Sequence, residues 1–126
     1  VKMAISKDEK IAKADYTSKW ISNPLSRKFS HKLRFSSQAI LTSSKTIIKD
    51  NPRFTIRKEG KIIKHIPIII IDSSLKIPLK SKLLKDLEKK RIIIFTTTQG
   101  KKLNILKKLG CEIIILKKQA NNKINK

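Results

Sequence analysis

Three isoleucine-rich runs constrain the fold more than any other feature of this chain. They are "IPIIIID" (66–72), "RIIIFTTT" (91–98) and "CEIIILK" (111–117). None alternates strictly between apolar and polar residues, so we expect strands that are covered on both faces of a sheet. Leucine-spaced segments at 81–90 and 101–110 lie between the runs and predict helices. Strands that alternate with helices indicate an α/β domain with a largely parallel sheet.

The first half of the chain is less regular. We expect a strand at 1–6, a loop at 7–19 and a helix that begins at Pro24, with Ser22 or Asn23 as its cap. Beyond it we expect a strand at 39–41, a short helix that stops before Pro52, and an extended segment at 53–57. The helical spacing i, i+4, i+8 should turn one row of this first helix toward a core: Leu25, Phe29 and Leu33.

The net charge of +22 does not by itself indicate nucleic-acid binding. Lysine and isoleucine are both abundant and both have A/T-rich codons, so compositional bias can raise them together. The lysines are spread along the chain, and aromatic residues, at 5%, are too few for a base-stacking platform. We favour a solvated charged face and no nucleic-acid partner, and keep a basic nucleic-acid-binding module as the alternative.

Other sequence features indicate no covalent or metal chemistry. The single cysteine, Cys111, cannot form an intrachain disulfide, and we expect a small buried residue rather than a catalytic thiol. His31 and His65 have no partners at metal-ligand spacing, so no metal site is predicted. The run "IPIIII" is far shorter than the roughly 18 apolar residues of a membrane span, so we expect no membrane partner and a cytoplasmic location.

The arginines are distributed unevenly. Four of the five lie between positions 27 and 57: Arg27, Arg34, Arg53 and Arg57. Arginine presents a planar fork of donors that matches phosphate oxygens two at a time, which lysine cannot do. Arg34 and Arg57, with a hydroxyl such as that of Ser18, could therefore converge on one phosphate. The alternative is that these arginines form surface ion pairs or cap a helix end.

Four segments in order carry a resemblance to a known family: "KMAISKDEKIA", "SKWIS", "LRFSSQAILTSSKTIIKDNPRFTIR" and "PIIIIDSS". Together they resemble the reductase domain of the bacterial bifunctional riboflavin-biosynthesis deaminase/reductase, over nearly the whole chain. The resemblance implies a dihydrofolate-reductase-like fold, a mixed and largely parallel sheet flanked by helices. It also implies an oxidoreductase that binds NADPH without a glycine-rich fingerprint.

The implied reaction converts the ribosyl group of 5-amino-6-(5-phosphoribosylamino)uracil into a ribityl chain. By this resemblance Ser18, Arg34, Phe54 and Arg57 bind the substrate, with phenylalanine at position 54 where the family usually has leucine. Lys2 is a candidate for polarising the substrate near the reacting carbon. NADPH-contacting positions are matched by Ala4, Trp20, Thr46, Asp50 and Ser73. From the residues alone, Trp20 could equally be a core aromatic and Asp50 could cap the turn before Pro52.

Two departures from the family pattern matter. Glu9 stands where the family has a glycine that permits a tight turn. We also expect residues 1–126 to be the N-terminal and central part of the reductase domain, truncated at its C-terminus, with a zinc deaminase domain upstream in a longer polypeptide. A homo-oligomer is expected from the family. The alternatives are a reductase of the undeaminated diaminopyrimidine ribosylamino phosphate and a remnant that keeps only the fold.

Overall fold

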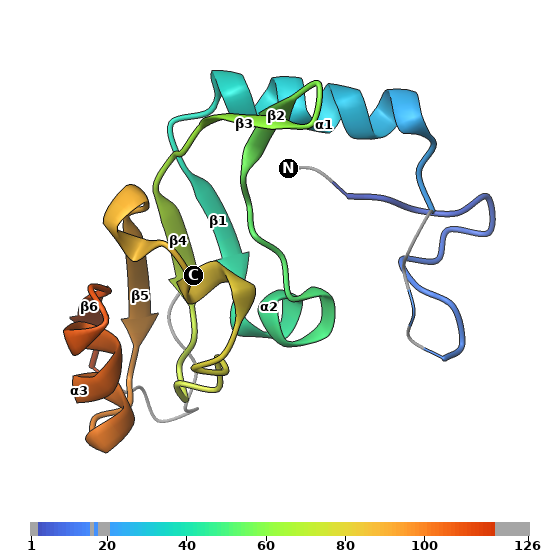
Figure 1. Cartoon of the computed structure of the whole chain (residues 1–126). Helices are drawn as coiled ribbons and strands as arrows, with labels where there is room; N and C mark the ends of the chain where they lie inside the picture. The colour runs from blue at the N-terminus through green and yellow to red at the C-terminus, as the bar shows by residue number, and fades with distance from the viewer. Residues whose placement is uncertain (1–2, 16, 18–20, 118–126) are drawn as a thin grey trace. The chain divides into compact units, whose positions relative to one another are not determined.

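The chain forms two compact units, residues 1–36 and residues 37–126. The computed structural model describes residues 3–15, 17 and 21–117, and each unit is considered by itself (Figure 1). No helix in the described part of the chain is long and apolar enough to cross a membrane.

In the described part of the first unit, one helix is present, α1 (Pro24–Ser36), and turns and loops precede it. The side-chain oxygen of Asn23 accepts a hydrogen bond of 2.8 Å from the backbone N–H of Ser26, and Pro24 follows the cap. This confirms the predicted helix start, because asparagine satisfies an unpaired N–H and proline has none to satisfy.

The strand expected at 1–6 is wrong for the residues of that segment that the structure describes, 3–6, which form no strand. Ser6 instead closes a turn. Its carbonyl accepts from the Glu9 N–H at 3.0 Å, and its hydroxyl donates to Asp8 at 2.5 Å. Glu9 has a φ of 61°, in the left-handed region that glycine adopts most readily. A left-handed turn therefore forms here although a glutamate occupies the position.

The apolar row of α1 does not face a core as we expected. Leu25 is 77% exposed, Phe29 58% and Leu33 42%, and α1 has no buried residue. An apolar stripe is buried only where a second layer covers it. Among residues 3–15, 17 and 21–36, no other helix or strand is present to do so.

The second unit is built on a four-stranded parallel sheet, as the isoleucine runs predicted. Its strands lie in the order β1-β4-β5-β6, and every neighbouring pair is parallel (Figure 1). Their bounds are β1 (Ile40–Ser43), β4 (Ile68–Ile71), β5 (Ile92–Thr96) and β6 (Glu112–Ile115). The helix predicted before Pro52 is present as α2 (Ser44–Asp50), and the helix predicted at 101–110 is present as α3 (Lys101–Lys108).

A separate antiparallel hairpin, β2 (Ile56–Lys58) and β3 (Lys61–Lys64), follows α2. The extended segment predicted at 53–57 ends within β2, but β3 was not predicted. Glu59 and Gly60 form the connection with φ values of 50° and 79°. Two successive residues with positive φ are typical of a tight hairpin turn whose twist matches that of its strands.

The helix predicted at 81–90 is wrong. Two short 3-10 turns occupy the segment, η1 (Lys82–Leu84) and η2 (Leu87–Lys89). Asp86 between them has a φ of 57°, which interrupts any right-handed helix. Leu83 and Leu84 are nevertheless both buried, so the leucines reach the core without a continuous helix.

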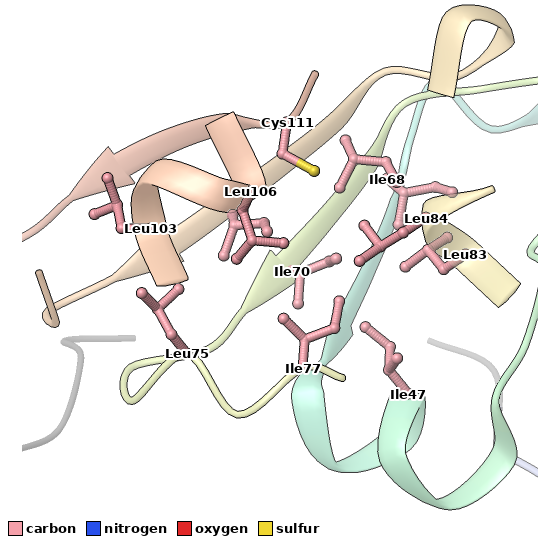
Figure 2. Packing of buried hydrophobic residues seen from close by; sticks show 12 residues of the cluster. Ile47, Ile68, Ile70, Leu75, Ile77, Leu83, Leu84, Leu103, Leu106 and Cys111 are labelled. Atoms are coloured by element: carbon pink, nitrogen blue, oxygen red, sulfur yellow. The ribbon is translucent and has the colours of Figure 1, made fainter. Parts of the chain in front are cut away.

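One face of the parallel sheet carries the core. Alternate residues of the two central strands are fully buried there: Ile68, Ile70, Ile92 and Ile94. They pack with Ile47 of α2, with Leu103 and Leu106 of α3, and with the leucines of η1 (Figure 2). Because both helices join this one cluster, the residues on the opposite face, such as Ile69 and Ile93, are only half-buried. Burial on both faces, which we expected for these strands, is therefore only partly present in the central strands: one face is buried and the other is half-buried.

Candidate functional site at the carboxyl edge of the sheet

Polar side chains gather where three neighbouring parallel strands end. β1 runs directly into α2, β4 is followed by Asp72 and Ser73, and β5 ends in three consecutive threonines. In open α/β sheets, ligands bind outside the carboxyl ends of the strands. This edge is therefore the candidate site, and the expected cofactor residues Thr46 and Ser73 both lie along it.

The carbonyl oxygen of Ser73 is the most densely bonded acceptor at this edge. The backbone N–H of Thr97 donates to it at 3.2 Å. The hydroxyl groups of Thr96, Thr97 and Thr98 also donate to it, at 3.1, 3.0 and 2.8 Å. Ser73, the second residue after β4, is thereby hydrogen-bonded to the end of β5. These threonines were not anticipated as site residues, although the run "TTT" after a buried strand was visible in the sequence.

The carboxylate of Asp72 holds the same loop from its other end. Asp72 is 2% exposed. Its two oxygens accept from the backbone N–H groups of Lys76 at 2.9 Å and Ile77 at 2.8 Å. Its carbonyl accepts from Leu75, which has a φ of 49°. A buried carboxylate needs such donors, so Asp72 and the loop fix one another.

The other expected cofactor residue in this unit, Asp50, is exposed at the last position of α2. Asn51 forms the C-cap in the left-handed conformation, with its N–H donating to the carbonyl of Ile47 at 3.0 Å. The side-chain oxygen of Asn51 accepts from the Lys82 N–H at 2.8 Å. Asn51 therefore caps the C-terminus of α2, and Asp50 is exposed at the last position of the helix.

The expected substrate residues Phe54 and Arg57 flank the start of β2. Phe54 has a φ of 50°, uncommon for a large side chain, and packs against the core cluster. The Nε–H of Arg57 donates to the hydroxyl of Thr55 at 3.1 Å, which positions an otherwise exposed side chain. Strained backbone of this kind often accompanies binding sites.

Ala4 and Arg34 belong to the first unit. Ala4 is half-buried in the looped segment, and Arg34 lies in the last turn of α1. Burial lowers the pKa of the Arg34 guanidinium. Lys2, Ser18 and Trp20 lie outside the described residues. Convergence of Ser18, Arg34 and Arg57 on one phosphate therefore stays a prediction.

For Arg27 the structure supports the alternative of helix capping, and Arg91, which lies outside the group at positions 27–57, forms an ion pair. Arg27 Nη1 donates to the carbonyl of Ser22, just before α1, so this arginine helps to close the helix start. Arg91 forms an exposed two-pronged ion pair with Glu112, with donor–acceptor distances of 2.7 and 3.0 Å. The hydrogen bonds from Arg91 lower the pKa of Glu112.

Cys111 is buried in the core cluster, as the sequence indicated (Figure 2). Burial raises the pKa of its thiol to about 11. At pH 8 only about one thousandth of the thiol is then ionised, and only the thiolate is nucleophilic.

We expect native protein to react far more slowly with a thiol-specific disulfide reagent than protein unfolded in urea. Because the folded-state pKa is the higher one, the free energy of unfolding should fall as the pH rises from 9 toward 11. Equal reaction rates in the native and unfolded protein would contradict the burial.

The parallel sheet and the polar residues at its carboxyl edge place the second unit in the class of open parallel α/β domains, whose ligands generally bind outside the carboxyl ends of the strands. The chain belongs to the family described as "RibD C-terminal domain", which it matches over residues 1–122.

Curated relatives agree with this assignment. The chain is 37% identical over 120 residues to "Riboflavin biosynthesis protein RibD" of Aquifex aeolicus (strain VF5), covering 93% of this chain and 32% of the relative. It is 37% identical over 117 residues to the protein of the same name from Chlamydia trachomatis serovar D, covering 90% and 31%. The chain thus spans about a third of the length of the curated relatives it matches.

Solved structures confirm the expected fold class, a dihydrofolate-reductase-like mixed and largely parallel sheet flanked by helices. A deaminase/reductase structure from Thermotoga maritima has a TM-score of 0.66 and 32% identity, covering 78% of this chain and 27% of that one. Acinetobacter baumannii RibD, form 1, has a TM-score of 0.74 at 23% identity, covering 91% and 32%, and supports the fold alone.

Proposed function

We propose that this chain forms part of a reductase of riboflavin biosynthesis that uses NADPH to reduce 5-amino-6-(5-phosphoribosylamino)uracil to the ribitylamino phosphate. Family membership over residues 1–122 carries the proposal. The Thermotoga maritima structure at 32% identity is described as a diaminohydroxyphosphoribosylaminopyrimidine deaminase/5-amino-6-(5-phosphoribosylamino)uracil reductase. The site at the carboxyl edge of the sheet agrees with binding of an extended cofactor there.

The residues at this edge fit a cofactor that is held by backbone and hydroxyl groups. Ser73 is half-buried on a loop that is fixed by the Asp72 carboxylate and by the threonine hydroxyls. We assign Ser73, Thr46 and Asp50 to the cofactor, together with Ala4 and Trp20. NADPH, when bound, supplies the hydride that reduces the sugar carbon.

The protein's own contribution is to bind, orient and exclude water, because hydride transfer requires no nucleophile from the chain. We assign Arg34, Arg57 and Ser18 to the substrate phosphate, since the arginine fork matches phosphate oxygens. Phe54 lines the substrate beside Arg57. Lys2 is the candidate for a cation near the developing charge at the reacting carbon.

The longer relatives support a further part of the proposal. Because the chain corresponds to about a third of their length, we propose that residues 1–126 form the N-terminal and central part of a reductase domain. A zinc deaminase domain precedes it in the same polypeptide, which is a cytoplasmic homo-oligomer.

The test follows NADPH absorbance in the full-length gene product after addition of the phosphoribosylamino-uracil and, separately, of its undeaminated precursor. We expect oxidation with the uracil compound. Oxidation with the precursor alone would assign the protein to the alternative reductase of the undeaminated pyrimidine. Absence of oxidation with both, in folded protein, would contradict the proposal and leave the nucleic-acid-binding alternative, which predicts affinity that falls steeply with salt.

A further inference from the structure

A pocket lies in the second unit, with a volume of about 480 Å³. The hairpin contributes Ile62, Ile63 and Lys64 to its wall, and the segment before β5 contributes Asp86, Lys89 and Lys90. Arg53, Thr55 and His65 complete the lining. The volume falls within the range of about 300–1,000 Å³ that small-molecule sites occupy.

This pocket is at the opposite edge of the sheet from the candidate site. His65 comes shortly before β4, and Lys90 comes shortly before β5. Ser73 and Thr96, in contrast, lie where those same strands finish. Because β4 and β5 are parallel, their amino ends share one edge and their carboxyl ends share the other. The pocket therefore does not belong to the candidate cofactor site.

Positive charge dominates the lining. Arg53, Lys64, Lys89 and Lys90 contribute four cations, and the acidic residue among the described residues that line the pocket is Asp86. Like charges brought together on a concave surface create a positive potential that favours an anion.

Lys90 is the buried cation of this lining. It is 9% exposed, and its Nζ donates to the carbonyl of Lys85 at 2.7 Å, which fixes the ammonium group. Burial is the main cause that lowers the pKa of Lys90; Asp86 raises this pKa, Arg53 lowers it and Glu88 raises it. A buried lysine that faces another cation is stabilised by an anion between them.

The pocket also offers an apolar wall. Ile62 and Ile63 are 46% and 48% exposed, so both side chains retain surface that a ligand can cover. We propose that this pocket binds a small organic phosphate, with its phosphate against Arg53, Lys64 and Lys90 and its apolar part against the two isoleucines. The proposal does not rest on the proposed reductase function, although Thr55, which lines the pocket, accepts a hydrogen bond from Arg57.

The test uses phenyl phosphate as the probe, titrated into the protein at pH 8 and about 0.15 M ionic strength, where distant surface charges are largely screened. The imidazole NMR signals of His65, which lines the pocket, should shift saturably. Those of His31, which belongs to the other unit, provide an internal reference. The double variant Arg53→Gln/Lys64→Gln should weaken binding at least tenfold.

A matched control is Lys101→Gln/Lys107→Gln, which removes the same charge from exposed positions of α3. It should change the affinity less than twofold. Equal losses in both double variants would attribute the binding to the general charge of the chain and overturn the proposal. Inorganic phosphate that binds as tightly as phenyl phosphate would overturn the organic part of the assignment, and no saturable shift at His65 would overturn the site.

Discussion

Replacing Arg57 with alanine should lower kcat/KM for the phosphorylated substrate about 100-fold, because about 3 kcal/mol of charge-assisted hydrogen bonding to phosphate is lost. Arg57→Lys should recover only part of this loss, since a single ammonium group cannot reproduce the two parallel bonds of the guanidinium. The measurement is steady-state oxidation of NADPH by the full-length gene product, with the substrate varied.

The matched control is Arg91→Ala. Arg91 is also a paired arginine, but its partner is Glu112, across the β5–β6 strand pair. Its removal should leave kcat/KM unchanged. Because Arg57 also donates to Thr55, the urea midpoint of each variant separates lost binding from lost structure. Normal kcat/KM in a folded Arg57→Ala protein would place the phosphate elsewhere.

Asp72→Asn should lower the free energy of unfolding by about 3 kcal/mol, because an amide can accept from only one of the two backbone N–H groups and leaves the other buried without a partner. The loop that carries Ser73 should loosen at the same time, so NADPH affinity should fall as well. Urea unfolding gives the stability, and fluorescence titration with NADPH gives the affinity.

Glu88→Gln is a suitable control for this variant, since Glu88 is an exposed acidic residue in η2. It should change the free energy of unfolding by less than about 0.5 kcal/mol. A loss of stability in Asp72→Asn no larger than in Glu88→Gln would show that the hydrogen bonds of Asp72 do not hold the loop.

The parallel sheet could be predicted because its central strands consist almost entirely of isoleucine, and a buried parallel strand leaves little choice of residue type. The hairpin strand β3 could not, since its ends are lysines and its four residues are exposed. The helix predicted at 81–90 is wrong because the leucine spacing indicates which side chains are buried but not the backbone conformation that buries them. The left-handed conformation of Asp86 has no clear local signature.

The candidate site, too, could be predicted from the sequence only in part. Ser73, Thr46 and Arg57 could be proposed as site residues because they fall within long motifs that resemble a family. The roles of Asp72 and of Thr96 to Thr98 could not be read from the sequence, because their bonds depend on which strand lies beside which. Only the pairing of β4 with β5 brings the threonine hydroxyls to the carbonyl of Ser73.

The bonds that converge on Ser73 have a consequence for the energetics of ligand binding. A loop that is free in the apo protein must be ordered when a ligand arrives, and the conformational entropy lost then reduces the affinity. Here side-chain hydroxyls and a carboxylate order the loop during folding. Part of the affinity for whatever binds at this edge is therefore set by threonines and an aspartate that need never touch the ligand.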